Sequence, residues 1–246
     1  MESKAVLYIR SSLFWLGFIL TTTVFGLLIV LFFFLPSDIR LRLAKLWSIA
    51  NNFLLKIFCG IDYQVTGVEN LGTQNAIILC KHQSTWETIA LHSFTPLARW
   101  VFKRELMYIP IFGWALALTD PIALNRGAGR AAIKQLFKKG GEKLKQGKWL
   151  ILFPEGTRTA PGKTHKYKIG GALLAEKTGY PIVPVAHNAG EFWPRHSFIK
   201  WPGTISVVIG PAIKTQDRVA EDINQEVSQW IEETMETISD PSRWNR

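Results

Sequence analysis

Short apolar runs alternate with helical segments through most of this chain, and this alternation constrains the fold more than any other feature. Each run is four to six residues long, which is typical of a buried strand. Alternating strands and helices predict an α/β fold with a largely parallel mixed sheet flanked by helices. The predicted strands are Tyr63–Thr66, Ala76–Cys80, Arg99–Phe102, Pro121–Leu124, Trp149–Phe153, Ile182–Ala186 and Thr204–Ile209, and the first and last of these are candidates for the sheet edges. The predicted helices are Thr85–Phe94, Gly127–Gln146, Gly170–Thr178 and Asp217–Ile238.

A stretch without charged residues, Ser12–Leu35, precedes the alternating part. It is long enough for a transmembrane helix, which needs about 20 apolar residues. It is too long for the apolar region of a signal peptide, and no small-residue cleavage site follows it. Positive residues lie on both sides, among them Lys4 and Arg10 before it and Arg40 after it. The segment therefore either spans the membrane or dips into one leaflet with both ends on the same face.

A second predicted helix, Ile39–Cys59, carries apolar residues at helical spacing with basic residues between them. This pattern favours an interfacial helix over one that only packs on the domain. We therefore predict two parts: membrane-anchoring helices in residues 1–60 and an α/β domain in residues 61–246. The N-terminal part is the hydrophobic, membrane-associating helical segment of the predicted fold.

The charge of the chain indicates the chemistry of its partners. The formal net charge is +10 and the pI is near 9.7, so anionic partners are expected. The sequence contains no zinc-ligand spacing or other nucleic-acid module, so we expect anionic lipid and phosphorylated substrates rather than nucleic acid. Two cysteines, Cys59 and Cys80, give no disulfide framework, which is consistent with a reducing compartment.

The stretch Lys81–Glu87 has the features of a catalytic loop. His82 follows a predicted strand, and open α/β sheets place their sites at the carboxyl ends of strands. Ser84 and Glu87 form a capping box, in which the glutamate turns back toward the preceding loop. A carboxylate on one imidazole nitrogen would leave the other as a general base. The alternative is that Glu87 only caps the helix and His82 is a structural loop residue.

Cationic residues also end predicted strands. Lys103 follows one strand, Arg126 another, and Arg158 lies in the loop Pro154–Arg158 after a third. Gly156 permits a tight turn in that loop, and a guanidinium group suits a phosphate. These cations could converge on one anion. The alternative for Arg158 is a solvated arginine after an ordinary turn, which the local sequence alone favours.

These residues together resemble the glycerolipid acyltransferases of the 1-acylglycerol-3-phosphate acyltransferase family. His82 and Glu87 are similar to its His-x-x-x-x-Asp motif, with glutamate where the family usually has aspartate. Pro154–Arg158 is its Pro-Glu-Gly-Thr-Arg block, letter for letter. The resemblance runs from about Val65 to Ile213, in the family's order. Its other blocks are similar to Phe102–Leu106 with Ile109, Pro110 and Gly113, to Ile122–Arg126, and to Ile182–Ala186.

The resemblance implies roles for the candidate residues. His82 is implied as the catalytic base and Glu87 as its partner. The residues implied in substrate binding are Lys103, Arg126 and Arg158 for the phosphate and Glu155 for the glycerol of the acceptor. Gly156 and Thr157 of the same block are also implied in substrate binding. No cofactor and no metal are implied, because acyl-CoA or acyl-carrier protein enters as the donor substrate. Lys168 resembles a family lysine before a helix and is left open.

We expect a membrane enzyme that transfers a fatty acyl group to 1-acylglycerol-3-phosphate, giving phosphatidate. The expected location is the cytoplasmic face of the inner (plasma) membrane, against an anionic lipid surface. Another acceptor remains open, namely another lysophospholipid, glycerol-3-phosphate, an ornithine-type lipid or a lipid A precursor. A non-catalytic lipid-binding protein of the same fold also remains open.

Two further features bear on these alternatives. The sequence contains no Gly-x-Ser-x-Gly elbow, so a serine acyl-enzyme is not supported. The stretch Met107–Leu118 is unusually apolar, and it is interpreted either as core or as a wall for an acyl chain.

Overall fold

The computed structural model describes residues 3–244, apart from the side chain of Arg126. Within this part of the chain, seven strands form one sheet in the order β1-β7-β6-β2-β5-β3-β4. Neighbouring strands are parallel except for β6 and β7, so the predicted largely parallel mixed sheet is confirmed. The strands are β1 (Ile61–Thr66), β2 (Ile77–Cys80), β3 (Ala98–Lys103), β4 (Ile122–Leu124), β5 (Trp149–Leu152), β6 (Ile182–His187) and β7 (Gly203–Ile209).

β1 lies at a sheet edge as expected, but β7 lies between β1 and β6. The prediction of an edge position for β7 is therefore wrong. Its alternation of buried and half-exposed residues resembles an edge strand, because one face of this end of the sheet is only partly covered.

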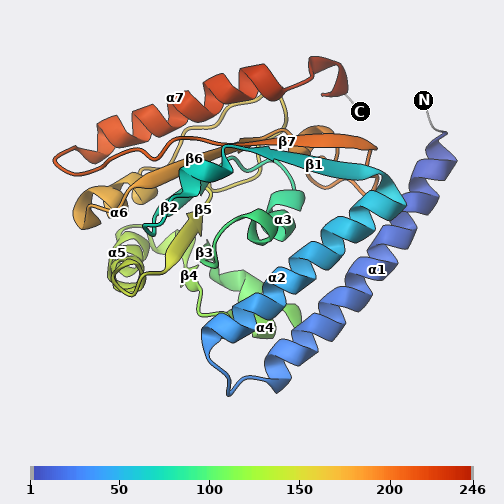
Figure 1. Ribbon diagram of the computed structural model, residues 1–246, viewed down its shortest axis with the longest axis horizontal. Coiled ribbons are helices and arrows are strands. Elements are labelled where there is room, and N and C mark those ends of the chain that lie inside the picture. The colour runs from blue at the N-terminus through green and yellow to red at the C-terminus, as the bar shows by residue number, and fades with distance from the viewer. Residues whose placement is uncertain (1–2, 245–246) are drawn as a thin grey trace.

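Helices cover both faces of the sheet (Figure 1). The helices are α1 (Lys4–Leu31), α2 (Ser37–Leu54), α3 (Trp86–Phe94), α4 (Phe112–Leu118), α5 (Arg130–Lys145), α6 (Gly170–Thr178) and α7 (Ala220–Ile238). The predicted helices all form: α6 has the predicted bounds, α3, α5 and α7 are shorter than predicted, and α1 and α2 begin and end earlier. α4 was not predicted. Short 3₁₀ or π turns are η1 (Leu55–Cys59), η2 (Val68–Leu71), η3 (Arg104–Tyr108), η4 (Arg126–Ala128), η5 (Ala189–Glu191) and η6 (Pro241–Arg243).

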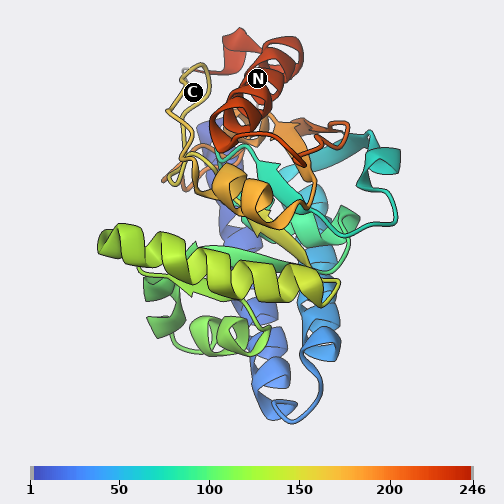
Figure 2. The same ribbon diagram turned by 90° about the vertical axis from the view of Figure 1, so that its left-hand side faces the viewer.

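The central strands are apolar on both sides because each side has its own core. Successive residues of β2 alternate: Ile78 packs with α3 and the N-terminal helices, whereas Ile77 packs with α5, α6 and α7. Figure 2 looks onto the second side, with α5 across the sheet below α6 and α7. Strands buried on both faces read as continuous apolar runs, which is why they were visible in the sequence.

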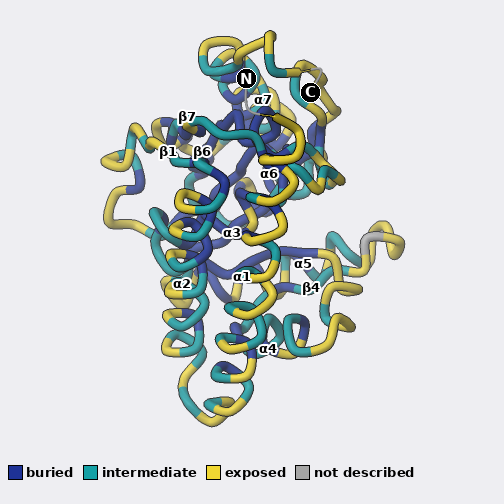
Figure 3. The backbone as a smooth tube through the Cα atoms, turned by 90° about the vertical axis from the view of Figure 1, so that its right-hand side faces the viewer, coloured by how far each residue is buried: buried dark blue, intermediate teal, exposed yellow. Residues whose placement is uncertain are grey.

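The N-terminal helices α1 and α2 form an antiparallel pair that lies along the domain (Figure 1). α1 is long and apolar enough to cross a membrane by length and composition. Its buried residues are spread from Leu7 through Phe14 to Ile29, so it contacts protein along its whole length. Many of its other side chains are exposed, as the tube coloured by burial shows (Figure 3).

Polar contacts and shared core tie this pair to the α/β domain. Asp38 at the start of α2 binds Lys148 Nζ at 2.6 Å and also pairs with Arg99. The predicted boundary falls at Gly60, between η1 and β1. Phe14 and Leu55 nevertheless belong to the same hydrophobic core as the sheet. The two predicted parts therefore share one packed interior.

Candidate active site

His82 lies in the loop between β2 and α3, and another loop holds its backbone on both sides. Its amide donates to Glu155 Oε2 at 2.6 Å. Its carbonyl accepts from the Thr159 amide at 2.7 Å. β2 and β5 are parallel neighbours, so the loops after them leave the same edge of the sheet and meet there. The Pro-Glu-Gly-Thr-Arg loop therefore fixes the position of His82.

The His82 side chain is paired with Glu87. Nδ1 of the ring lies 2.7 Å from Glu87 Oε1, which also accepts from the amides of Gln83 (2.9 Å) and Ser84 (2.8 Å). Burial raises the pKa of the Glu87 carboxyl, but His187, His82 and the Ser84 amide more than offset it, so the pKa is lowered. Glu87 is therefore an anion, and it places the proton of a neutral His82 on Nδ1. The lone pair then lies on Nε2.

Packing fixes the orientation of the His82 ring. It stacks on Phe153, with centroids 3.9 Å apart and planes 9° apart. The His82 side chain is 15% exposed and lines a cavity, so the ring reaches the cavity while Nδ1 stays bound to Glu87. A base held in one tautomer and one orientation loses little freedom when it takes up a proton.

Ser84 is bound to the scaffold rather than offered as a nucleophile. Its Oγ donates to the Trp193 carbonyl at 2.6 Å and accepts from the Trp86 amide at 3.1 Å. The predicted capping box is thus half formed: Glu87 accepts from the Ser84 amide, but Ser84 caps Trp86 instead of Glu87. Both of these hydrogen bonds join Ser84 Oγ to the backbone, so its role is structural.

Glu155 binds the backbone of His82, whereas Glu87 binds its ring. An acceptor contact was predicted for Glu155, and the structure places its side chain away from the cavity lining. Its Oε1 lies 3.0 Å from Lys81 Nζ, and its side chain is fully buried and does not line the cavity. Lys81 also binds Glu232 Oε1 at 2.6 Å, which accepts from Tyr167 Oη at 2.8 Å. Burial raises the pKa of Glu155, and Lys81 partly offsets this. The buried ammonium requires a carboxylate beside it, which explains why Glu155 turns inward.

Several predicted cationic and loop residues do meet at the cavity. Lys103, Gly156, Thr157 and Arg158 all line it together with His82. Arg158 Nη1 donates to Thr85 Oγ1 at 2.7 Å, which holds the guanidinium beside the start of α3. The side chain of Arg126 lies outside the described part of the structure, and its backbone begins η4.

Gly156 makes the close packing of this loop possible. Its φ of +68° is in the left-handed region, and an added Cβ would lie 2.7 Å from Lys168 Nζ. The Lys168 amide also donates to the Pro154 carbonyl at 2.8 Å. Lys168, which the sequence left open, therefore lies across the loop rather than in the cavity wall.

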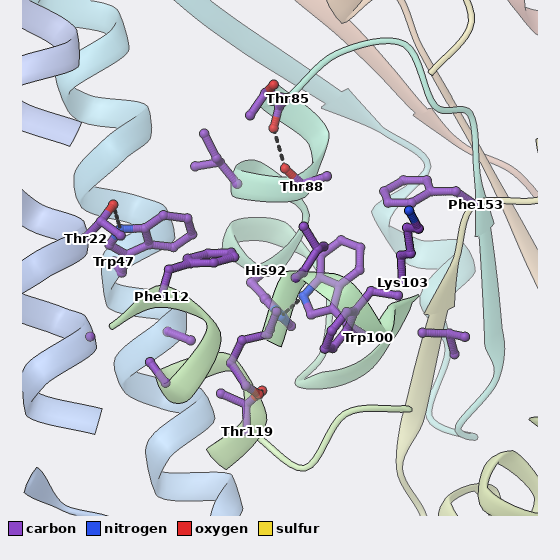
Figure 4. Close-up of a pocket in the computed structure, with 18 of the residues that line it drawn as sticks. Thr22, Trp47, Thr85, Thr88, His92, Trp100, Lys103, Phe112, Thr119 and Phe153 are labelled. Carbon is purple, nitrogen blue, oxygen red and sulfur yellow. Dashed lines mark hydrogen bonds between the residues drawn. The ribbon is translucent and has the colours of Figure 1, made fainter. Parts of the chain in front are cut away.

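The cavity has a volume of about 760 Å³ and is lined by His82 and by residues of α1, α2, α3 and α4. Its wall is mainly apolar away from the cations. Figure 4 shows Trp47, Phe112 and Trp100 directed into this region from α2, α4 and β3. The stretch around α4 contributes Phe112, Ala115 and Leu116 to the wall.

Comparisons with known proteins identify the family of this chain. The sequence model of the Acyltransferase family matches residues 62–188, just over half of the chain. A 1-acyl-sn-glycerol-3-phosphate acyltransferase from Pseudomonas aeruginosa is 44% identical over 239 residues, covering 94% of this chain and 92% of the relative. The chain belongs to the acyltransferase family.

Two further similarities extend the comparison. A 1-acyl-sn-glycerol-3-phosphate acyltransferase from Saccharomyces cerevisiae is 36% identical over 145 residues, covering 56% of this chain and 48% of the relative. The crystal structure of the 1-acyl-sn-glycerophosphate acyltransferase from Thermotoga maritima matches with a TM-score of 0.77 and 24% identity, over 93% of this chain and 94% of that one. This likeness supports the fold of the acyltransferase.

Sequence reasoning missed three parts of this acyltransferase site. Arg195 lines the cavity, but no strand end or motif marked it. Residues of α1 such as Phe18 and Phe25 form part of the wall, although the sequence indicated only an anchor. Lys81 was predicted only as part of a loop, yet its ammonium is buried between two carboxylates. The position of Lys81 next to the candidate base His82 was the one feature of the sequence that could have indicated its role.

Proposed function

We propose that this chain transfers a fatty acyl group from acyl-CoA or acyl-carrier protein to the free hydroxyl of 1-acylglycerol-3-phosphate, producing phosphatidate. The observation that carries the proposal is the His82–Glu87 pair, whose His82 lines a mainly apolar cavity together with Arg158 and Lys103. Such a site offers a base, a place for an acyl chain and cations for a phosphate. The Pseudomonas relative with this activity in its name aligns over nearly its whole length.

The reaction is a direct transfer with His82 as the base. Nε2 takes the proton of the acceptor hydroxyl while the oxygen attacks the thioester carbonyl carbon. The tetrahedral intermediate then expels the thiolate, and the imidazolium returns the proton to the sulfur. The new ester bond replaces the C–S bond, and no covalent enzyme intermediate forms. The thioester is already activated, so the proposal requires neither a cofactor nor a metal ion.

Glu87 orients the base and stabilises its charged form. A buried carboxylate 2.7 Å from Nδ1 attracts the imidazolium that forms during attack. Two backbone amides also bind the same oxygen, so the carboxylate cannot rotate away. The same division of roles operates in the Ser-His-Asp triad, where the carboxylate fixes the tautomer.

The apolar part of the cavity receives an acyl chain. On α1 the wall runs from Phe18 to Ile29, and a rise of 1.5 Å per residue makes this about 16 Å. Leu41 and Ala44 of the neighbouring helix α2 also line the cavity. An aliphatic chain of the donor or acceptor fits such a slot with its carbonyl or hydroxyl near His82.

The acyltransferase lies on one leaflet rather than crossing the bilayer. α1 contacts the domain from Leu7 to Ile29, so a spanning α1 would have to leave these contacts. Its exposed face carries Ile9, Leu16, Leu20 and Leu31, each at least 61% exposed. A net charge of +10 favours the anionic cytoplasmic leaflet of the inner membrane. α1 and α2 would therefore lie in the interface with the cavity open toward the lipid.

The decisive assay presents purified protein with a labelled acyl thioester and a panel of acceptors. The panel contains 1-acylglycerol-3-phosphate, glycerol-3-phosphate, another lysophospholipid, an ornithine-type lipid and a lipid A precursor. We expect phosphatidate to be the main product. Preferential labelling of another acceptor would replace the proposed substrate, and no thioester consumption with any acceptor would support a binding protein instead.

A further inference from the structure

Arg195 lies at the cavity beside the residues already assigned to the acceptor. It follows η5 in the loop that leads to β7, far in sequence from the Pro-Glu-Gly-Thr-Arg block. It nevertheless lines the same cavity as His82, Lys103 and Arg158. Arg195 is exposed and lines the cavity, so its guanidinium is accessible to a ligand there.

Hydrogen bonds fix the orientation of the Arg195 guanidinium. Nη1 donates to the Arg158 carbonyl at 3.2 Å, and Nε donates to His196 Nε2 at 2.9 Å. The first bond holds the planar group against the loop of Arg158, and the second ties it to the next residue of its own segment. The Nη2 group and one Nη1 hydrogen are not used by these bonds, and a planar fork of this kind matches two oxygens of a phosphate.

The segment that carries Arg195 is itself anchored. Trp193 is buried, and its carbonyl accepts from Ser84 Oγ at 2.6 Å, next to Glu87. Lys200 Nζ lies 4.6 Å from the Trp193 ring centroid and 4.0 Å from that of Trp15. The segment is thus held by the catalytic loop and by α1. His196, at a φ of +62°, adopts a conformation that is uncommon for a residue with a side chain.

The charge of an acceptor phosphate exceeds the charge that Arg158 alone supplies at the cavity. A phosphate monoester carries a charge of about −1.5 to −2 at pH 7. The nearby cation Lys103 is 54% exposed and lies 3.4 Å from Glu105 Oε1, so its charge is partly neutralised. Arg158 supplies one full positive charge. Arg195 supplies another within the same cavity.

We infer that Arg195 is a second guanidinium ligand of the acceptor phosphate and that it selects phosphate-bearing acceptors over neutral ones. The inference rests on the proposed function, because it names a specificity residue of that same site. Its structural alternative is that Arg195 only braces the loop through the Arg158 carbonyl. The two roles predict different effects of charge at position 195.

The test measures kcat and KM of purified full-length protein with 1-acylglycerol-3-phosphate and with the phosphate-free 1-acylglycerol, both in mixed micelles. Arg195→Gln keeps hydrogen-bond donors but removes the charge, and Arg195→Lys keeps the charge but removes the fork. We expect Arg195→Gln to raise KM for the phosphate acceptor roughly tenfold, with kcat within about twofold. KM for the neutral acceptor should not change, and Arg195→Lys should recover part of the loss.

Arg218→Gln is the matched control, because Arg218 pairs with Glu226 and does not line the cavity. It should leave both KM values unchanged. Equal effects of Arg195→Gln on the two acceptors, or no effect on either, would overturn the inference while wild-type turnover still supports the proposed function. If the wild type itself fails to acylate 1-acylglycerol-3-phosphate, the proposed function fails instead. The two failures are therefore distinguishable in one experiment.

Discussion

Replacing Glu155 with glutamine removes one of the two carboxylates beside the buried Lys81 ammonium and weakens the bond to the His82 amide. A hydrogen bond to a charged group is worth about 1.5–3 kcal/mol, and glutamine retains part of it through its amide oxygen. Breaking a buried ion pair costs about 3–5 kcal/mol when the remaining charge has no other partner. Lys81 keeps Glu232 at 2.6 Å as a second partner, so the cost should lie at or below the lower end of this range. We expect Glu155→Gln to lower the free energy of unfolding by about 2–3 kcal/mol.

The assay combines thermal unfolding in detergent with acyl-transfer kinetics. For a chain of this length, 1 kcal/mol corresponds to about 2–4 °C, so Tm should fall by about 4–12 °C. kcat should fall because His82 loses its fixed backbone, whereas KM for the acceptor should change little. If Glu155 instead contacted the acceptor, as the family resemblance implies, KM would rise with little change in Tm. That result would refute the reasoning.

A double-mutant cycle isolates the ion pair from other effects. Lys81→Met combined with Glu155→Gln removes both charges, so no buried ammonium is left beside a lost partner. The double variant should be less destabilised than the sum of the two single variants. Additive losses would show that the 3.0 Å contact between the two side chains contributes nothing to stability.

Four further predictions follow from the site. Glu87→Gln should lower kcat about a hundredfold or more, because the imidazolium loses its counter-charge; near-normal kcat would leave Glu87 as a helix cap only. Arg158→Ala should raise the acceptor KM about ten- to a hundredfold, and Arg158→Lys should restore only part, so full restoration would argue against a bidentate contact. Ala44→Phe should shift kcat/KM toward shorter acyl donors by filling the cavity wall, and an unchanged chain-length profile would place the acyl chain elsewhere. Burial lowers the pKa of His92 from 6.5 to about 3, so the unfolded state binds a proton more readily than the folded state between these values. The free energy of unfolding should therefore fall by up to about 1.4 kcal/mol per pH unit as the pH drops from about 6.5 to about 3. His92→Gln, which keeps an acceptor for the Trp100 indole, should flatten that dependence in urea titrations, and an unchanged slope would refute the assignment.

The parts of the fold that were predictable from sequence are those with local signals. All predicted strands form, because buried parallel strands are continuous apolar runs bounded by turns. α6 has the predicted bounds, Gly170–Thr178. α4 was missed because its sequence, Phe112–Leu118, is apolar all round and gives no helical period.

The same contrast holds within the site. The pairing of His82 with Glu87 could be predicted because a capping box fixes the geometry over five residues. The inward position of Glu155 could not be predicted, because it depends on Lys81 and on Glu232, which lies 151 residues after Lys81 in the sequence. The place of Arg195 depends on how the loop before β7 packs against the Pro-Glu-Gly-Thr-Arg loop. Such contacts exist only once the sheet has formed.

The most direct test of the proposed mechanism is acyl transfer from a labelled thioester to 1-acylglycerol-3-phosphate by purified wild-type protein and by His82→Ala. The wild type should form labelled phosphatidate. His82→Ala should lose about a hundred- to ten-thousand-fold in kcat, with its unfolding transition and its affinity for the acceptor close to normal. Near-normal turnover by a folded His82→Ala protein would contradict the assignment of His82 as the base.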